Sequence, residues 1–221
     1  MVNAVAPGAP AHSIATTRGL LAAGVLAGPL FVGITAILTI SRPGFDLRRH
    51  GISLLSLGDR GWIQIANFVL AGALSIAFAV GVRRILRPGF GAVSAPVLTA
   101  GYGLGVIVTG VFLVDAGVGF PPGTAEGLPP EMSWHGTIHA IAPPSAFVMM
   151  VGVCAIFALR FRRLRRTGWS AYCLLTGLSS VLLLFWPGGG GSVRSAVAVL
   201  ITSVWTTALA LELMTEQRIA A

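Results

Sequence analysis

The sequence predicts an all-α fold, a polytopic membrane bundle of six transmembrane helices. Of its 221 residues, 55 % are hydrophobic and only 10 % are charged, whereas about a quarter of the residues in a typical soluble domain are charged. Six apolar stretches are long enough to cross a bilayer core roughly 30 Å thick. We therefore expect a transmembrane domain over residues 19–214, between a disordered N-terminal tail (1–18) and a short C-terminal tail (215–221).

The first predicted helix covers residues 19–40 and is expected to stay in the protein. Its apolar run is longer than the roughly 7–15 residues of a signal-peptide core, and the following Ser41-Arg42-Pro43 is no small-residue cleavage site. The other predicted helices cover residues 63–82, 92–114, 138–159, 171–186 and 196–213. The fifth of the six is the shortest.

The arginines predict the orientation of these helices. All fifteen basic residues are Arg. With six spans, one side of the membrane receives Arg18, Arg83, Arg84, Arg87, Arg160, Arg162, Arg163, Arg165, Arg166 and Arg218. The other side receives Arg42, Arg48, Arg49, Arg60 and Arg194. Because basic loops stay in the cytoplasm, we expect a protein of the cytoplasmic (inner) membrane with both termini cytoplasmic. The clustering of arginine at helix ends argues against nucleic acid as a partner.

Two loops are then expected to face outward. Residues 115–137 contain no Lys or Arg, as the orientation rule favours. Residues 41–62 carry four arginines and break that rule. Two interpretations stay open: these arginines bind lipid phosphates, or they pair with acidic residues of the other loop or an anionic ligand. The acidic residues concerned are Asp115, Glu126 and Glu131.

Polar residues from several elements are predicted to meet at this outward face. Asp115 closes the third span, and His135 and His139 open the fourth on one helical face because they are four residues apart. Ionisable residues near membrane depth usually face a cavity or each other. The leading hypothesis is a polar pocket for a membrane lipid or small amphiphile. Its expected ligand-binding residues are Arg48, Arg49, Ser56 and Asn67.

The alternative hypothesis is an enzyme that acts on a lipid-like substrate. Asp115, His135 and His139 would then hold Zn²⁺ or act as general acid and base. The motif His-Gly-Thr-Ile-His lacks the Glu that serves as base in His-Glu-x-x-His. A histidine pair at a helix start is equally suited to a structural latch that ties the loop to the bundle. Proton-coupled transport has less support, because no charged residue lies deep within a predicted span.

Three ordered segments carry a family resemblance: "HGISLLSLGDRGWIQIANFVLAGAL", "GVFLVDAGVGFPPGT" and "WHGTIH". Together they resemble the bacterial domain-of-unknown-function 998 family of small membrane proteins with about six spans. The resemblance covers roughly residues 18–213 and implies a fold but no activity. Its typical positions fall on Ser56, Leu57, Gly58, Asp115, Phe120, Pro121, Gly136 and His139. A looser similarity is to the alkaline ceramidase and progestin-receptor-like superfamily of zinc hydrolases, whose seventh span and C-terminal histidines are missing here.

Overall fold

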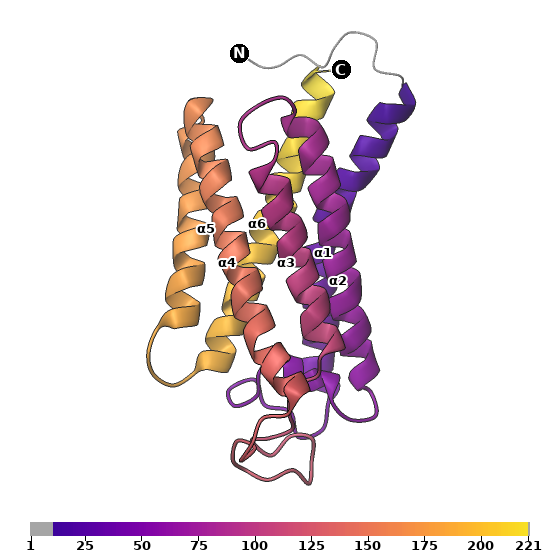
Figure 1. Ribbon diagram of the computed structural model, residues 1–221, viewed down its shortest axis with the longest axis vertical. Helices are drawn as coiled ribbons and strands as arrows, with labels where there is room; N and C mark the ends of the chain where they lie inside the picture. The colour runs from indigo at the N-terminus through magenta and orange to yellow at the C-terminus, as the bar shows by residue number, and fades with distance from the viewer. Residues whose placement is uncertain (1–10, 221) are drawn as a thin grey trace.

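The computed structural model describes residues 11–220 and confirms the all-α bundle (Figure 1). It contains six α-helices, each long and apolar enough to cross a membrane, and no β-strand within the described residues. The helices are α1 (Ala11–Ser41), α2 (Gly61–Leu86), α3 (Ser94–Val111), α4 (Trp134–Arg163), α5 (Thr167–Phe185) and α6 (Gly191–Ala220), with a short 3-10 helix η1 (Ile52–Ser56).

The first and last helices of the chain are longer than the apolar spans predicted for them. α1 begins at Ala11, so residues 11–18, which the sequence places in a disordered tail, are helical. The first turns of α1 contact neighbouring helices through Arg84 Nη1, which donates to Thr17 Oγ1 (3.4 Å), and Gln217 Nε2, which donates to the Ile14 carbonyl (3.1 Å). The second contact also explains why α6 continues through the predicted C-terminal tail to Ala220. Residues 1–10 of the predicted tail lie outside the described residues.

The helices run up and down and form a ring. Each helix packs against the next one in the chain, and α6 returns to α1 and closes the ring. α1 begins and α6 ends at the same end of the bundle, at the top of Figure 1, which we call the terminal end. The opposite end carries the connections 42–60, 112–133 and 186–190, and we call it the loop end.

The half of the bundle near the terminal end has a solid apolar core. Its largest buried side chains include Phe78, Phe157, Phe161 and Trp205. The Trp205 indole N–H donates to the sulfur of Cys173 (3.4 Å), which is a free thiol. These four rings come from three helices, α2, α4 and α6, and pack in one cluster.

Polar bonds reinforce the same end. Arg160 donates to both carboxylate oxygens of Glu216 (3.1 and 2.7 Å), and Arg166 donates to Glu212 (2.6 Å) and Glu216 (3.2 Å). The carboxylates of Glu212 and Glu216 raise the pKa of the Arg166 guanidinium, although partial burial opposes this. The pairs join the ends of α4 and α5 to α6. The Arg160–Glu216 pair is bidentate, which makes it stronger than a single contact.

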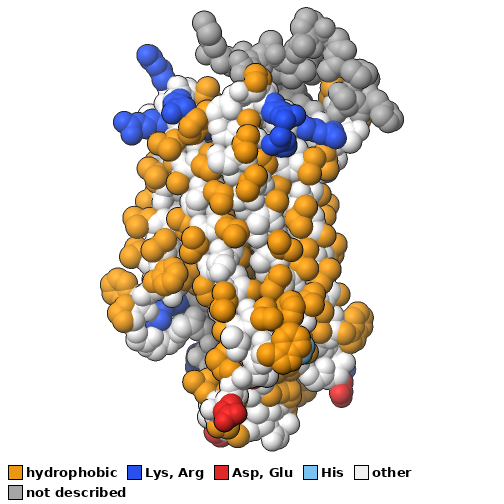
Figure 2. Space-filling view, viewed as in Figure 1, with side chains coloured by type: hydrophobic (Ala, Val, Ile, Leu, Met, Phe, Trp, Pro, Cys, Tyr) orange, Lys and Arg blue, Asp and Glu red, His pale blue; other side chains and the backbone are white. Residues whose placement is uncertain are grey.

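Charge is distributed unequally between the two ends, as Figure 2 shows by the blue side chains at the top and the red ones at the bottom. The terminal end carries ten of the fifteen arginines. The loop end carries five of the seven acidic residues: Asp46, Asp59, Asp115, Glu126 and Glu131. The unequal number of arginines predicts that both termini lie in the cytoplasm, and this orientation stays a prediction.

Candidate functional site

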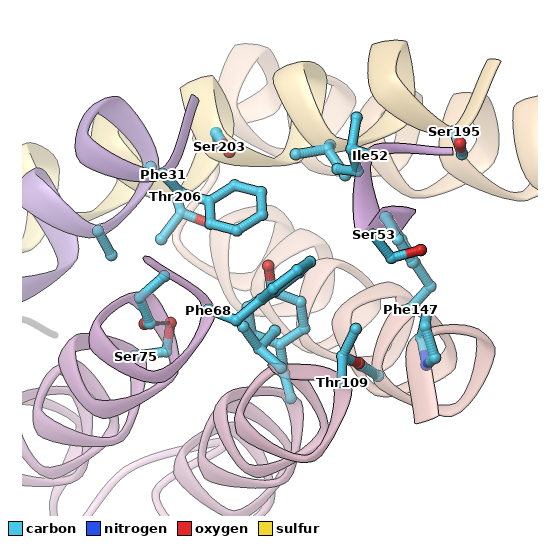
Figure 3. A pocket seen from close by; sticks show the side chains of 18 of the residues that line it. Phe31, Ile52, Ser53, Phe68, Ser75, Thr109, Phe147, Ser195, Ser203 and Thr206 are labelled. Atoms are coloured by element: carbon cyan, nitrogen blue, oxygen red, sulfur yellow. Dashed lines mark hydrogen bonds between the residues drawn. The ribbon is translucent and has the colours of Figure 1, made fainter. Parts of the chain in front are cut away.

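The half of the bundle near the loop end leaves an internal space between its helices. A cavity of about 160 Å³ lies between α1, α2, α3, α4 and α6 and beneath η1 (Figure 3). It reaches from η1 to about the middle of the helices. The residues that line it include Phe31, Ile52, Ser53, Phe68, Ser75, Tyr102, Val106, Thr109, Phe147, Ser195, Val199, Ser203 and Thr206.

Small residues hold two of the surrounding helices close together at the wall of the cavity. A Cβ on Gly28 of α1 would lie only 2.8 Å from the backbone oxygen of Ser203 in α6. Such small residues allow helix backbones to approach closely in a membrane. Pro143, in the middle of α4, also lines the cavity, yet α4 runs through Pro143 and Pro144 without a break. The prolines therefore contribute to the wall but do not end the helix.

The cavity wall mixes aromatic rings with hydroxyl groups, and the part of the chain that the structure describes contributes no Asp, Glu, His, Lys or Arg side chain to it. The hydroxyls of Ser75, Thr109 and Thr206 each donate to a carbonyl four residues earlier (2.8 Å each). Their oxygens can still accept a hydrogen bond from a ligand. The hydroxyls of Ser53 and Ser203 have no hydrogen-bond partner among the described residues, so they can both donate and accept.

Residues 42–60 and 112–133 close the loop end, and we call them the lid. Their main polar link is His50, which is buried. The backbone N–H of Asp46 donates to His50 Nδ1 (2.9 Å), so the proton of the neutral ring is on Nε2, which donates to the Val118 carbonyl (3.0 Å). Arg49 forms an ion pair with Glu126 and also donates to the Val118 carbonyl (3.4 Å). The Arg49–Glu126 pair thus agrees with one of the two interpretations of the basic loop, that its arginines pair with acidic residues of the other loop.

Arg42 supports the lid from inside. Its guanidinium donates to the Leu57 carbonyl and lies 5.6 Å from the centre of the Phe120 ring. Phe120 is fully buried, and its ring lies 5.4 Å from the rings of both Phe45 and His50. A cation over an aromatic face is attracted by the electrons of the ring. The two segments of the lid are therefore joined by a packed aromatic cluster as well as by polar bonds.

Asp115 caps the start of α4. The backbone N–H of Ser133 donates to Asp115 Oδ2 (2.9 Å), and the Gly136 N–H donates to the Ser133 hydroxyl (3.0 Å). The hydroxyl and the backbone N–H of Ser133 both hydrogen-bond to Asp115 and hold its pKa below the usual value, against a smaller effect of desolvation. A Cβ on Gly136 would overlap the carboxylate of Asp115. Glycine at position 136 is what allows a negative charge to lie at the positive end of this helix.

His139 makes the reciprocal contact at the end of α3. Its Nδ1 lies 3.1 Å from the Thr109 carbonyl and 2.8 Å from the Phe112 carbonyl. Because carbonyls only accept hydrogen bonds, Nδ1 carries the proton and donates to them. These carbonyls belong to the last turn of α3, which lacks partners within its own helix. His135 does not join this contact: it is exposed, and its ring stacks on Trp134 with centroids 3.6 Å apart.

None of the site residues predicted from the sequence lines the cavity. Asp115, His139 and Arg49 hold the lid and the helix ends, whereas Arg48 and His135 are exposed. Ser56 is buried in η1, and its hydroxyl has no hydrogen-bond partner within residues 11–220. Asn67 is buried in α2, where its amide donates to the Phe31 carbonyl and to Thr35 and Gln64 (3.1–3.2 Å). A ligand-binding role for these residues stays a prediction.

The three side chains considered as zinc ligands, Asp115, His135 and His139, are not brought together. Within residues 11–220, no group of three or more His, Cys, Asp or Glu side chains is placed to hold a metal ion. His139 Nδ1 faces carbonyls, Asp115 accepts from Ser133, and His135 points to Trp134. The contacts that His139 makes agree with the other interpretation of this histidine pair, a structural latch between the loop and the bundle.

Sequence reasoning missed the cavity because its wall looks like ordinary membrane helix. Phe31, Phe68 and Val106 are typical lipid-facing or packing residues, and nothing in the sequence marks them as neighbours. A weak signal was present in the hydroxyls, since Ser75, Tyr102 and Ser203 each lie well inside a span. Serine and threonine in membrane helices commonly bond to their own backbone, so this signal does not by itself indicate a site.

Comparison with known protein families matches residues 25–212, which is most of the chain. No curated protein and no solved structure was found to match. The eight positions that carry the resemblance all lie at the loop end. Six of them lie in the lid, and the other two, Gly136 and His139, lie in the first turns of α4. The chain belongs to the family described as "Protein of unknown function (DUF998)".

Proposed function

We propose that this membrane protein binds a lipid or small amphiphile in the cavity beneath its lid. The observation that carries the proposal is the contrast between the two halves of one bundle. The terminal half is packed with large rings, whereas the loop-end half leaves a cavity of about 160 Å³ among five helices. Membrane helices associate by close packing, so a hollow at the centre of the ring forfeits contacts that a ligand would restore.

The chemistry of the wall favours an amphiphile over a purely apolar ligand. Rings of Phe31, Phe68 and Phe147 supply apolar surface, and the hydroxyls of Ser53 and Ser203 are available to a polar group (Figure 3). Ligand sites typically combine a mostly apolar lining with a few polar groups that orient the ligand. With no charged side chain in the wall, an ionised ligand group would be left without a counter-charge at a high desolvation cost.

The lid gives the proposed site a barrier against water. Its underside contributes Gly51, Ile52 and Ser53 to the cavity wall, and the two lid segments are joined through His50, Arg49 and the Phe120 ring cluster. If both termini are cytoplasmic, this cavity lies in the outer half of the membrane. The protein would then hold its ligand close to, but shielded from, the external medium.

Filling the cavity tests the proposal. Val106 lines it from α3, so Val106→Trp is expected to occupy the space that a ligand would use. The measurement is native mass spectrometry of full-length protein extracted gently with its membrane lipids. Wild type should carry an amphiphile that survives removal of the detergent, and at least a tenfold smaller fraction of Val106→Trp should carry it.

Val97→Trp is the matched control, because Val97 lies on the same helix but is 59 % exposed on the outer surface. It should retain the bound species as wild type does. Thermal unfolding of both variants verifies that they are folded. A wild type free of any bound amphiphile, or equal retention by Val106→Trp, would show that the cavity is not a lipid site.

A further inference from the structure

A second hollow lies beside the cavity, on the outer surface of the bundle between α1 and α6. Its volume is about 310 Å³, and its walls include Val32, Ala36 and Ile40 of α1 and Val197 and Leu200 of α6. It contains no charged side chain. Both helices are candidate membrane spans over this length, so the groove faces lipid chains rather than water.

The groove and the cavity share three wall residues: Phe31, Ile52 and Val199. Phe31 packs against Phe68, with ring centroids 5.1 Å apart, and Ile52 and Val199 pack against this pair. A single layer of side chains therefore separates the two hollows, with no helix backbone between them. A path between the two hollows would therefore open by rotation of these side chains, without movement of a helix.

The spacing of α1 and α6 explains why the groove is at this place. The helices approach closely at Gly28 and Ser203, and a little deeper the Thr207 hydroxyl donates to the Val25 carbonyl (3.3 Å). The groove begins directly beyond this contact, on the side of the loop end, and is closed there by Leu47 of the lid. The tight contact thus forms the floor of an opening that faces the membrane.

We propose that the groove is a lateral entrance through which a single-chain lipid with a small uncharged head reaches the cavity, the head lying inside and the chain lying in the groove. This inference rests on the proposed function and adds the route and the ligand class. Phe31, Ile52 and Val199 form the gate.

Three properties of the walls define this ligand. The cavity is close in volume to an engineered cavity of about 150 Å³ that accepts benzene, so it admits a glycerol-sized head but not a second chain. The free hydroxyls of Ser53 and Ser203 lie in the cavity and none lies in the groove. Both walls lack charge, which excludes a phosphate head. A monoacylglycerol or a fatty alcohol has the required form.

Photolabelling in nanodiscs tests the inference. The probe is a monoacylglycerol with a diazirine in its acyl chain, offered to full-length protein in phosphatidylcholine, and labelled peptides are mapped by mass spectrometry. Labels should concentrate on residues 31–40 and 193–200. Val197→Trp, which fills the groove at a position already 38 % exposed, should lower labelling at least fivefold. Val193→Trp is an independent variant of the same groove.

Val148→Trp serves as the control, since Val148 is 61 % exposed on α4 and lines neither hollow. It should label as wild type does. Labelling that extends evenly to exposed α5 residues such as Leu174 would contradict the proposal that the groove is the entrance. If Val106→Trp prevents labelling but both groove variants label normally, the cavity binds lipid and only the lateral route is wrong. If lysophosphatidylcholine carrying the same chain labels equally well, the uncharged head is wrong.

Discussion

Asp115 and His139 form a reciprocal pair of helix caps. Asp115 follows α3 and binds the N-terminus of α4, whereas His139 belongs to α4 and binds the last carbonyls of α3. Each side chain satisfies backbone groups that a helix end leaves without partners, and the Asp115 carboxylate has the sign that a helix N-terminus attracts. The two contacts fix the junction between α3 and α4 directly beside the cavity, because Thr109, whose carbonyl accepts from His139, also lines the cavity.

Gly136→Ala should destabilise this junction. The added Cβ would overlap the Asp115 carboxylate, so the carboxylate must move and lose the Ser133 N–H. The expected loss is about 1–3 kcal/mol, that of a broken hydrogen bond to a charged group. Thermal unfolding in detergent measures it. Gly168→Ala is the control, because nothing lies within 4 Å of a Cβ at that helical position, and alanine there should be neutral or stabilising by up to about 1 kcal/mol.

A double variant separates the overlap from other effects of alanine. Once Asp115→Ala removes the carboxylate, Gly136→Ala should cost nothing further, so the two changes together should be no worse than Asp115→Ala alone. Additive losses, by contrast, would mean that Gly136 and Asp115 act independently and that the close contact is not what requires glycine.

At the scale of elements, two arginines of the lid differ in what they contribute. Arg42 donates to the Leu57 carbonyl and lies over the buried Phe120 ring. Arg49 forms an ion pair whose side chains are 50 % and 78 % exposed, and such surface pairs contribute about 0–1 kcal/mol. The inner arginine therefore stabilises segment 42–60 itself through Leu57 and touches segment 112–133 only through the Phe120 ring, whereas the exposed ion pair adds little.

Arg42→Ala should open the lid, whereas Arg49→Ala should leave it closed. Hydrogen–deuterium exchange of the amides of Leu57 and Gly61 reports on this, because they donate to the carbonyls of Leu54 and Gly58 beside the Arg42 contact. Loss of a hydrogen bond from a charged donor, about 1.5–3 kcal/mol, corresponds to exchange roughly 10- to 100-fold faster in Arg42→Ala. Equal protection in both variants would contradict the assigned difference.

The elements themselves could be predicted from the sequence, but their enclosed space could not. Long apolar runs identify all six helices because a bilayer leaves few alternatives to a helix. Polar residues such as Asp115 and His139 could be placed at one membrane face by counting residues from the helix ends. Their partners could not, since Gly136 and the Thr109 carbonyl give no pattern in the sequence. The cavity depends on the distances between helices, which hydropathy does not contain.

At the scale of the whole molecule, orientation decides which leaflet supplies the ligand. The terminal end carries ten arginines, and two of them, Arg160 and Arg166, are paired with Glu212 and Glu216. At the loop end, Arg49 is paired with Glu126 and Arg194 donates to the carbonyls of Trp186 and Gly188 (3.0 and 2.9 Å). Most of the arginines at the loop end are thus bonded within the protein. The orientation rule counts basic residues whether or not they have acidic partners, so the larger number at the terminal end still decides the prediction.

Both termini are accordingly expected in the cytoplasm, with the lid outside. Reporters fused after Gly89, Gly123, Gly168 and Gly190, which lie in four successive connections or their edges, should report inside, outside, inside and outside. Alkaline phosphatase, active only outside, and a fluorescent protein, active only inside, give opposite signals at each position. A cytoplasmic signal at Gly123 would invert the bundle: the cavity and its lateral groove would then open to the inner leaflet, and any ligand would have to come from lipids on that side.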